Sequence, residues 1–329
     1  MRGPLRRRDF TALLGAAAVA GTLPGCSSRS AGAPRFFDAP ASYDAAVRAV
    51  RALIARDVAD PAILPAARPR LYVHGVPVQH AVVLFHGFTN CPQQFDELAR
   101  RFHARGCNVY VPRLPHHGLR DRLTRDLTNV TVDELADAAT EAFALTRALG
   151  ATVRALGLSL GGTMVQWLAQ TQPLDLAVPI APFLIPYPLP PVIGEPAMRV
   201  LATLPGMYFW WDYHVKEKCL PHYAYPGYPT HALARIVLFG DVIFARAETT
   251  KPLADRCVLV LNEPDGAIDN GVARKLTALW NAHGAGYREL VLPGLPGLAG
   301  AHDVIDPTTY PAGRHAVYPK LEALVLAGS

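Results

Sequence analysis

The sequence lacks several features that mark whole classes of protein. It has little excess of positive charge for nucleic-acid binding, because residues 1–25 supply +3 of the formal net charge of +5 and the rest of the chain only +2. No internal repeat is evident, and the apolar stretch at residues 10–23 is shorter than the roughly 18 to 20 residues of a membrane-spanning helix. A hydrophobic content of 50% over 329 residues excludes disorder for most of the chain. With 26 Gly and 30 Pro, the composition predicts a compact, loop-rich protein of one large domain or two modest ones.

Cysteine is also scarce and follows no pattern. The five cysteines include no C-x-x-C pair, and their spacings do not form a disulfide framework. We therefore expect mostly buried thiols at Cys91, Cys107, Cys219 and Cys257. If the protein is exported, a disulfide between some pair of these four stays open as an alternative.

The amino terminus has the pattern of an export signal. The sequence RRDF at residues 7–10 resembles a twin-arginine signal, and LPGC at residues 23–26 resembles a bacterial lipobox, although its proline stands where a small residue is usual. We expect residues 1–25 to be the signal and residues 26–41 to be a linker. We also expect Cys26 to be acylated, so that it anchors the protein to a membrane on the periplasmic or extracellular side of a bacterial envelope. The alternative is a plain cleaved signal in which Cys26 has no role.

From residue 42 onward, short β-rich runs alternate with helical ones, which is the pattern of an α/β protein. The clearest strands are apolar nearly throughout, as strands covered on both faces must be: 81–85, 108–111, 152–156, 176–180, 257–261 and 288–292. Helices are expected between and around them: 42–58, 92–105, 132–149 with Thr131 as N-cap, 160–171, 230–247, 270–282 and 315–326. The first of these helices carries one apolar stripe, formed by Val47, Val50, Ile54 and Val58.

One interval breaks this alternation. About 75 residues separate the strands near 180 and 257, many more than a crossover connection needs, and they are rich in proline and aromatic residues. We expect residues 183–256 to form a cap inserted into a core made of residues 42–182 and 257–329. Within the cap, Trp210 and Trp211 are candidates either for the cap's own core or for the lining of an acyl pocket.

A candidate nucleophile follows the strand at 152–156. The chain continues as GLSLGG at residues 157–162 and then as a helical run, which is the strand, turn and helix context of a G-x-S-x-G nucleophile elbow. Small residues at both glycine positions allow the sharp turn that holds the serine oxygen clear of the sheet. This pattern predicts Ser159 as a nucleophile, against the alternative of an ordinary serine in a glycine-rich turn.

A serine hydroxyl needs a base to attack a carbonyl carbon, and the base needs a carboxylate to orient it. In chains with this elbow the order is serine, acid, histidine. Asp265 lies in a tight turn after a predicted strand, where the acid belongs; Asp269, which is expected to cap the next helix, and Glu263 are rivals. His302 ends the glycine-rich loop that follows the last predicted strand, and it is the predicted base.

Two backbone N–H groups are predicted to stabilise the negative charge that develops on the substrate. One belongs to Leu160, directly after the nucleophile, and the other to Phe88 in an H-G-F-T-N run. His86 in the same run is better explained as a structural hydrogen-bonding residue. The adjacent histidines at 116–117 have no spaced carboxylates or cysteines beside them, so no metal site is expected.

Four ordered motifs together resemble the α/β-hydrolase family, and within it bacterial carboxylesterases and monoacylglycerol-lipase-like enzymes. They are the H-G-F-T-N run, GLSLGG, the E-P-D turn that ends at Asp265, and His302, and the resemblance covers roughly residues 70–328. It implies a mostly parallel sheet with helices on both faces, a cap over the site, a serine triad, ester substrates and no cofactor. We therefore expect an exported serine hydrolase that cleaves short- to medium-chain acyl esters or monoacylglycerols.

Other functions on the same fold stay open. A proline-type aminopeptidase would need carboxylates in the cap to bind the substrate amine, and the sequence offers Glu195, Asp212 and Glu217. An acyltransferase would use the same triad. A non-catalytic binding lipoprotein would have no reason to keep the nucleophile, base, acid and both oxyanion turns.

Overall fold

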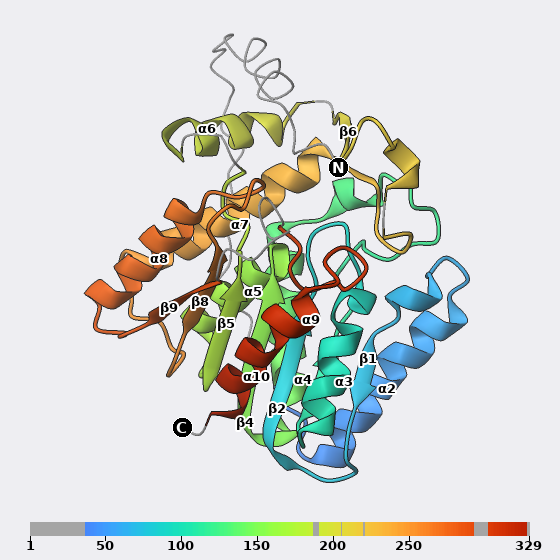
Figure 1. The fold of residues 1–329 in the computed structure, drawn as a ribbon, viewed down its shortest axis with the longest axis vertical. Helices are drawn as coiled ribbons and strands as arrows, with labels where there is room; N and C mark the ends of the chain where they lie inside the picture. Colours follow the sequence, from blue (N-terminus) through green and yellow to red (C-terminus); the bar gives the residue numbers. More distant parts are fainter. Residues whose placement is uncertain (1–36, 187–190, 205, 220, 293–301, 328–329) are drawn as a thin grey trace.

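The computed structural model describes residues 37–327, apart from residues 187–190, 205, 220 and 293–301 and the side chains of 191–195. Within these residues, seven strands form one sheet in the order β1-β3-β2-β4-β5-β8-β9 (Figure 1). β1 runs antiparallel to β3, and every other neighbouring pair is parallel. The strands are β1 (Arg70–Tyr72), β2 (Val78–Phe85), β3 (Asn108–Val111), β4 (Gly150–Leu158), β5 (Leu176–Ile180), β8 (Val258–Asn262) and β9 (Arg288–Leu292).

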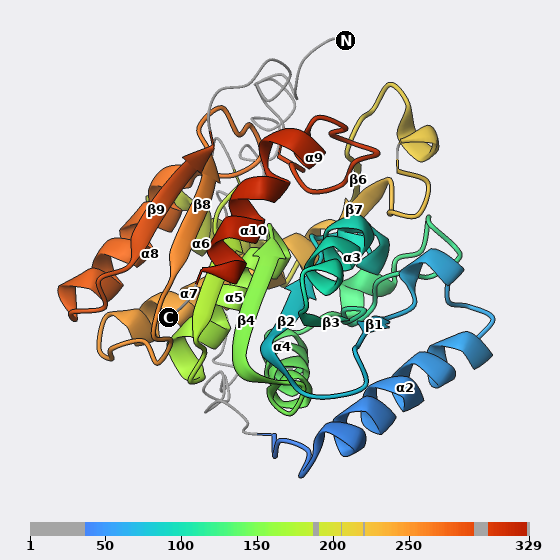
Figure 2. The same cartoon turned by 60° about the horizontal axis from the view of Figure 1, so that its bottom comes forward.

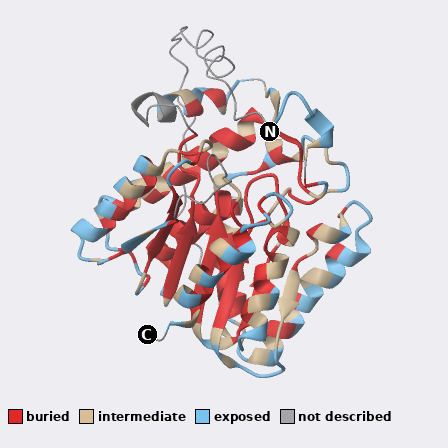
Figure 3. Cartoon of the chain, viewed as in Figure 1, coloured by how far each residue is buried: buried red, intermediate tan, exposed pale blue. Residues whose placement is uncertain are grey.

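The six strands expected from the sequence correspond to β2, β3, β4, β5, β8 and β9, and three of them begin and end at the predicted residues. The middle of the sheet is buried (Figure 3): residues 81–85 of β2 are inaccessible to solvent. β9 lies at the edge and leaves Arg288, Glu289 and Val291 exposed. β1 has no counterpart in the sequence prediction, because three half-buried residues are too few to show an alternating pattern.

Helices cover both faces of the sheet (Figure 2). α3 and α10 lie on one face, where Arg101 forms an ion pair with Glu322. α4, α5 and α8 lie on the other face, where Trp280 of α8 donates a hydrogen bond of 2.5 Å to Gln170 of α5. No helix among the described residues is both long and apolar enough to cross a membrane. The bounds are α2 (Tyr43–Ala59), α3 (Asp96–Ala104), α4 (Val132–Arg147), α5 (Leu160–Thr171), α8 (Asn270–Ala282), α9 (Gly313–Ala316) and α10 (Tyr318–Leu326).

The helix boundaries follow local rules that the sequence makes visible. Thr131 caps α4 as predicted, in a capping box with Glu134. The helix expected at 92–105 is a 3₁₀ turn, Pro92–Phe95, followed by α3. The helix expected at 315–326 is divided into α9 and α10, because Pro319 fits the first turn of a helix but not its interior.

The region predicted as a cap contains α6 (Pro191–Leu201), a two-stranded ribbon of β6 (Tyr208–Trp210) and β7 (Gly227–Pro229), and α7 (Thr230–Ala247). α6 and β6 lie above the end of the sheet at which β5 finishes (Figure 1). α7 begins and ends as predicted, and it packs against α5 of the core, where the rings of Trp167 and Phe239 are 5.7 Å apart. The sequence did not reveal α6, β6 or β7, since proline and aromatic residues gave no clear period there.

The structure shows no disulfide among the four cysteines that it describes. Cys91, Cys107 and Cys257 are buried and Cys219 is half-buried, which confirms the prediction of mostly buried thiols. Burial raises the pKa of Cys91 to about 12 and that of Cys107 to about 11. These two groups therefore remain protonated near neutral pH.

α2 is attached to the core by a buried ion pair that the sequence did not reveal. The predicted apolar stripe is right for Val47 and Val50, which are buried, but wrong for Val58, which is 50% exposed. The neighbouring Asp57 points inward instead and is 2% exposed. Its Oδ2 accepts a hydrogen bond from Arg113 Nε at 2.6 Å, and its Oδ1 accepts one from Arg113 Nη2 at 3.0 Å.

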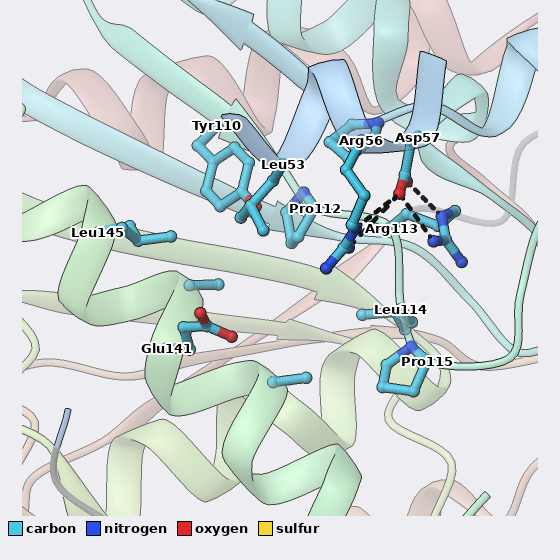
Figure 4. Close-up of a pocket in the computed structure, with 13 residues that line it drawn as sticks. Leu53, Arg56, Asp57, Tyr110, Pro112, Arg113, Leu114, Pro115, Glu141 and Leu145 are labelled. Carbon is cyan, nitrogen blue, oxygen red and sulfur yellow. Dashed lines mark hydrogen bonds and ion pairs between the residues drawn. The ribbon is translucent and has the colours of Figure 1, made fainter. Parts of the chain in front are cut away.

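This ion pair lines a cavity of about 210 Å³ between α2 and α4 (Figure 4). Burial alone would raise the pKa of Asp57, but the hydrogen bonds and charge of Arg113, with a smaller contribution from Arg56, lower it below its usual value. Arg113 also donates a hydrogen bond of 3.1 Å to the carbonyl of His117. The pair therefore connects α2 to the loop that follows β3.

Removing the charge of Asp57 should destabilise the fold in a pH-dependent way. Asp57→Asn should lower the free energy of unfolding by about 3 kcal/mol at neutral pH, because it leaves Arg113 buried without its anion. A carboxylate with a lowered folded-state pKa stabilises the fold above its unfolded pKa, near 4, and loses this effect as the pH falls through the folded value. Urea unfolding at pH 7 and at pH 3 should therefore show a smaller difference between the parent and the variant at pH 3.

Glu141 on the opposite wall of the same cavity is exposed and provides the matched control. Glu141→Gln should change the free energy of unfolding by less than about 0.5 kcal/mol. A loss in Asp57→Asn that is the same at both pH values would contradict the ion-pair explanation.

Candidate active site

The turn between β4 and α5 holds Ser159 in a strained backbone conformation. Its φ is 57° and its ψ is −117°, a region that non-glycine residues rarely occupy. The turn is fixed by backbone hydrogen bonds: Ser159 N–H donates to Ile180 O at 2.9 Å, and Ser159 O accepts from Phe183 N at 3.1 Å. The serine is 5% exposed, so it lies beneath other parts of the chain.

The two glycines of the motif are required by close approach of the backbone. A Cβ at Gly157 would overlap the carbonyl of Gly161, and a Cβ at Gly161 would overlap the carbonyl of Phe85 in β2. Any larger residue would push α5 away from β2 and β4. The sequence prediction of a tight elbow at these positions is therefore confirmed by the geometry of the turn.

A carboxylate and an imidazole meet after β8 and β9. His302 Nδ1 lies 2.7 Å from Asp265 Oδ2, and the Asp265 side chain is completely buried while that of His302 is 24% exposed. Asp265 Oδ1 accepts a second hydrogen bond, from Ala267 N at 2.9 Å. With Nδ1–H donating to the carboxylate, Nε2 is the ring nitrogen left to accept a proton from another group.

Charge near His302 favours its protonated form. Burial alone would lower the pKa of His302, but the charge and hydrogen bond of Asp265, with a contribution from Asp303, raise it above its usual value of 6.5. The ring is therefore a stronger base than a free histidine. It must still lose its proton to act as a base, so activity that depends on it should increase with pH through this raised pKa.

The two rival carboxylates have other partners. Asp269 caps α8, and its Oδ1 accepts a hydrogen bond from Gly271 N at 2.8 Å, which is the capping role expected from the sequence. Glu263 forms an ion pair with Arg274 near the protein surface. Asp265 is thus the carboxylate of these three that the structure brings to His302.

The run at residues 86–90 forms the turn after β2. His86 is fully buried; its Nε2 accepts a hydrogen bond from Leu114 N at 3.2 Å, and its Nδ1 lies 3.0 Å from Gly87 O. Burial and the neighbouring His117 hold the pKa of His86 well below its usual value. His86 is therefore a neutral, structural hydrogen-bonding residue, as expected, and it fixes the backbone just before Phe88.

Leu160, the other predicted oxyanion residue, is the first residue of α5. The first amides of a helix have no carbonyl partner within the helix, and the helix dipole adds partial positive charge at this end. A negatively charged oxygen beside Ser159 would be favoured by this environment.

The two adjacent histidines have separate surroundings. His116 lies 3.0 Å from Asp126 and 3.4 Å from Glu134, whereas the buried His117 makes a hydrogen bond of 2.7 Å to Pro115 O. Burial lowers the pKa of His117 to about 4, so it is neutral. In the part of the chain that the structure describes, no three His, Cys, Asp or Glu side chains gather as metal ligands.

The two cap tryptophans differ in their surroundings. Trp211 donates a hydrogen bond of 2.8 Å from Nε1 to Thr89 Oγ1, and its ring lies 6.1 Å from that of Phe88 in an edge-on arrangement. Trp210 instead packs against Tyr208, at 5.3 Å. Trp211 lies one residue beyond the end of β6, and of the two tryptophans it is the one with a hydrogen bond to the turn after β2.

Some predicted features lie outside the described residues. These are the signal and lipobox, Cys26, most of the linker and the glycine-rich loop that precedes His302. The side chain of Glu195 is also outside them. The other two carboxylates proposed for an aminopeptidase, Asp212 and Glu217, are exposed on the cap.

Residues 76–225 match the protein family described as serine aminopeptidase, S33. This range includes the turn after β2 and the elbow at Ser159. A thermostable monoacylglycerol lipase from Bacillus sp. (strain H-257) is 32% identical over 111 residues, which make up 34% of this chain and 42% of that lipase. The chain thus matches less than half the length of this relative.

Solved structures resemble more of the chain. The monoacylglycerol lipase of Paleococcus ferrophilus has 17% identity and a TM-score of 0.58, with 78% of this chain and 97% of that chain covered. A soluble variant of the monoglyceride lipase of Saccharomyces cerevisiae has 13% identity and a TM-score of 0.59, with 78% and 90% covered. At these identities the likeness establishes the fold, and the predicted α/β-hydrolase fold is confirmed.

The two aspartates can be distinguished by the pKa of His302. Asp265→Asn should lower this pKa from its raised value in the parent, because it removes the charge that favours the protonated ring. Asp269→Asn is the matched control and should leave the pKa unchanged, since asparagine caps a helix as well as aspartate. The chemical shifts of the His302 ring protons, followed by NMR as the pH is varied, measure the difference. A shift seen only in Asp269→Asn would transfer the orienting role to that residue.

Proposed function

We propose that this α/β-hydrolase is a serine hydrolase of carboxylic esters, with short- to medium-chain acyl esters or monoacylglycerols as substrates. The observation that carries the proposal is the imidazole of His302 bound to the buried carboxylate of Asp265, in a chain that also holds Ser159 at a strained elbow. Relatives that are monoacylglycerol lipases support the substrate class.

In the proposed reaction, Ser159 Oγ attacks the ester carbonyl carbon while His302 Nε2 accepts the hydroxyl proton. The backbone N–H groups of Phe88 and Leu160 bind the oxyanion of the tetrahedral intermediate. His302 then gives its proton to the leaving alcohol, and the acyl group remains on Ser159. Water, activated by His302, hydrolyses this acyl-enzyme and restores the serine, while Asp265 keeps the ring in the tautomer that these transfers need.

The chemistry of the cap supports an apolar acyl group. Trp211, Phe88 and Tyr228 form an aromatic cluster, with the rings of Trp211 and Tyr228 4.4 Å apart and those of Phe88 and Tyr228 5.7 Å apart. Aromatic surface beside the proposed oxyanion turn favours contact with hydrocarbon. We therefore assign Trp211 to the acyl side of the site. Trp210, which packs on Tyr208, is assigned to the cap's own core.

The main alternative is an aminopeptidase, and the description of the matching family favours it. A peptide amine in a pocket needs a carboxylate that is shielded from water to bind it. Asp212 and Glu217 are exposed, and Asp212 Oδ1 already accepts a hydrogen bond from His214 N at 2.7 Å. An ester substrate has no amine to bind, so it fits the described residues better. An acyltransferase would share the acyl-enzyme and differ only in the acceptor.

The same proposal includes export and membrane anchoring. The twin-arginine-like residues 7–10 and the lipobox-like residues 23–26 support transport of the folded protein and acylation of Cys26. An anchor at Cys26 would hold the hydrolase beside lipid substrates without a membrane-spanning helix.

Replacing the proposed nucleophile should abolish hydrolysis. Ser159→Ala should reduce kcat for p-nitrophenyl butyrate by at least about 10⁴-fold, because loss of the nucleophile removes the acyl-enzyme route. Ser42→Ala, which removes only the N-cap of α2, should keep the parent's kcat and lose about 1 kcal/mol of stability. Activity of Ser159→Ala within tenfold of the parent would exclude Ser159 as the nucleophile.

Membrane attachment should depend on one cysteine. If Cys26 is acylated, the parent expressed in a bacterial host should partition into the detergent phase, and Cys26→Ser into the aqueous phase. Cys219→Ser changes a half-buried cysteine of the cap and should partition as the parent does. Identical partitioning of Cys26→Ser and the parent would contradict the lipid anchor.

A further inference from the structure

Gln94 connects two segments that come from opposite ends of the core. It lies in the 3₁₀ turn Pro92–Phe95 and is 2% exposed. Its Oε1 accepts a hydrogen bond from Gly87 N at 2.7 Å, and its Nε2 donates one to Asp303 Oδ2 at 2.8 Å. Gln94 and Asp303 are 209 residues apart in the sequence. The amide therefore bridges the turn after β2 and the segment that carries His302.

Each end of this bridge is next to a group with a proposed catalytic role. Gly87 directly precedes Phe88, whose N–H is the proposed oxyanion donor, and Asp303 directly follows His302, the proposed base. A hydrogen bond at Gly87 N restricts rotation of the backbone that aims the Phe88 N–H. A hydrogen bond at the carboxylate of Asp303 restricts the backbone that carries the imidazole.

Asp303 is itself held in one orientation. Its Oδ1 accepts hydrogen bonds from Ile305 N at 3.1 Å and from Asp306 N at 2.9 Å, so that Oδ2 is presented to Gln94. The charge of Asp303 also contributes to the raised pKa of His302. The backbone near His302, the carboxylate and the amide of Gln94 thus form one continuous set of hydrogen bonds.

Glutamine suits this position because one planar group carries both an acceptor and a donor. A shorter asparagine would reach only one of the two partners, and an apolar side chain would leave both the Gly87 N–H and Asp303 Oδ2 without that partner. Buried polar groups that lose their partners move or admit water, and either response would displace the loops.

We propose that Gln94 is a positioning residue that holds the oxyanion turn and the histidine-bearing segment at a fixed separation, so that Phe88 N–H and His302 Nε2 act on the same substrate. This inference rests on the proposed ester hydrolysis and adds a residue that touches none of the reacting atoms. Its effect is on kcat, because misplacing an oxyanion donor weakens binding of the transition state more than binding of the substrate.

An exchange of side chains between positions 94 and 303 tests the bridge. Gln94→Glu alone places two carboxylates against each other, and Asp303→Asn alone places two amide donors against each other. In the double variant, the carboxylate at position 94 accepts from Gly87 N–H and from the side-chain NH₂ at position 303, while the amide oxygen at position 303 still accepts from residues 305 and 306. The hydrogen bonds are restored with donor and acceptor exchanged, and the net charge equals that of the parent.

Each single variant and Gln94→Leu should lower kcat for p-nitrophenyl butyrate by about ten- to hundred-fold, with KM changed less than about threefold. The double variant should recover kcat to within about threefold of the parent, measured on the alkaline plateau of the pH profile. Gln79→Glu, a change of the same chemistry at an exposed position of β2, is the control and should match the parent.

Exchange of the Gly87 amide hydrogen, measured by NMR, gives a second readout that needs no substrate. It should be slow in the parent and the double variant and faster in Gln94→Leu. If Gln94→Leu does not fold, the comparison of kcat between Gln94→Glu and the double variant still tests whether the bridge positions the two segments. A folded Gln94 variant with the parent's kcat, or a double variant with no recovery, would overturn the inference about Gln94. Either result would leave the proposed ester hydrolysis standing. A folded parent without esterase activity would overturn the proposed function and the inference with it.

Discussion

Backbone atoms of β2, β4 and α5 approach so closely around Ser159 that two positions in the turn have no room for a Cβ. The carbonyls of Phe85 and Gly161 occupy the space in which side chains at Gly161 and Gly157 would lie. This contact forces Ser159 to a φ of 57° and directs the start of α5 toward the end of the sheet. The other features of the candidate site depend on this arrangement, because it places the serine and the first amides of α5 at the carboxyl ends of the parallel strands.

The residues that follow β2, β8 and β9 lie at the same carboxyl end of the sheet. Asp265 is completely buried and hydrogen-bonded to His302, which gives the imidazole a defined tautomer and a raised pKa. Trp211 of the cap donates a hydrogen bond to Thr89 in the turn after β2. A side-chain hydrogen bond from the cap thus reaches the turn that we assign to oxyanion binding.

The sequence predicted the elements whose signals are local. The elbow was visible because its glycines lie only two residues from the serine in the chain, and Asp265 was favoured over Asp269 because the latter precedes a helix that needs a cap. The buried Asp57, the partnership of Gln94 with Asp303 and the strands β1, β6 and β7 were not predicted. A polar pair 209 residues apart leaves no periodic trace, and no residue near Asp57 in the sequence indicates that Arg113, 56 residues later, will pair with it.

The claim at the centre of these proposals is that Ser159 is a nucleophile activated by His302. A fluorophosphonate reacts fastest with a serine whose hydroxyl proton can be taken by a base, and mapping of the labelled peptide by mass spectrometry identifies the residue. We predict one label per folded molecule, on the peptide that contains Ser159, with a labelling rate that falls as the pH drops through the raised pKa of His302. Folded protein that stays unlabelled, or that carries the label on another residue, would contradict the claim.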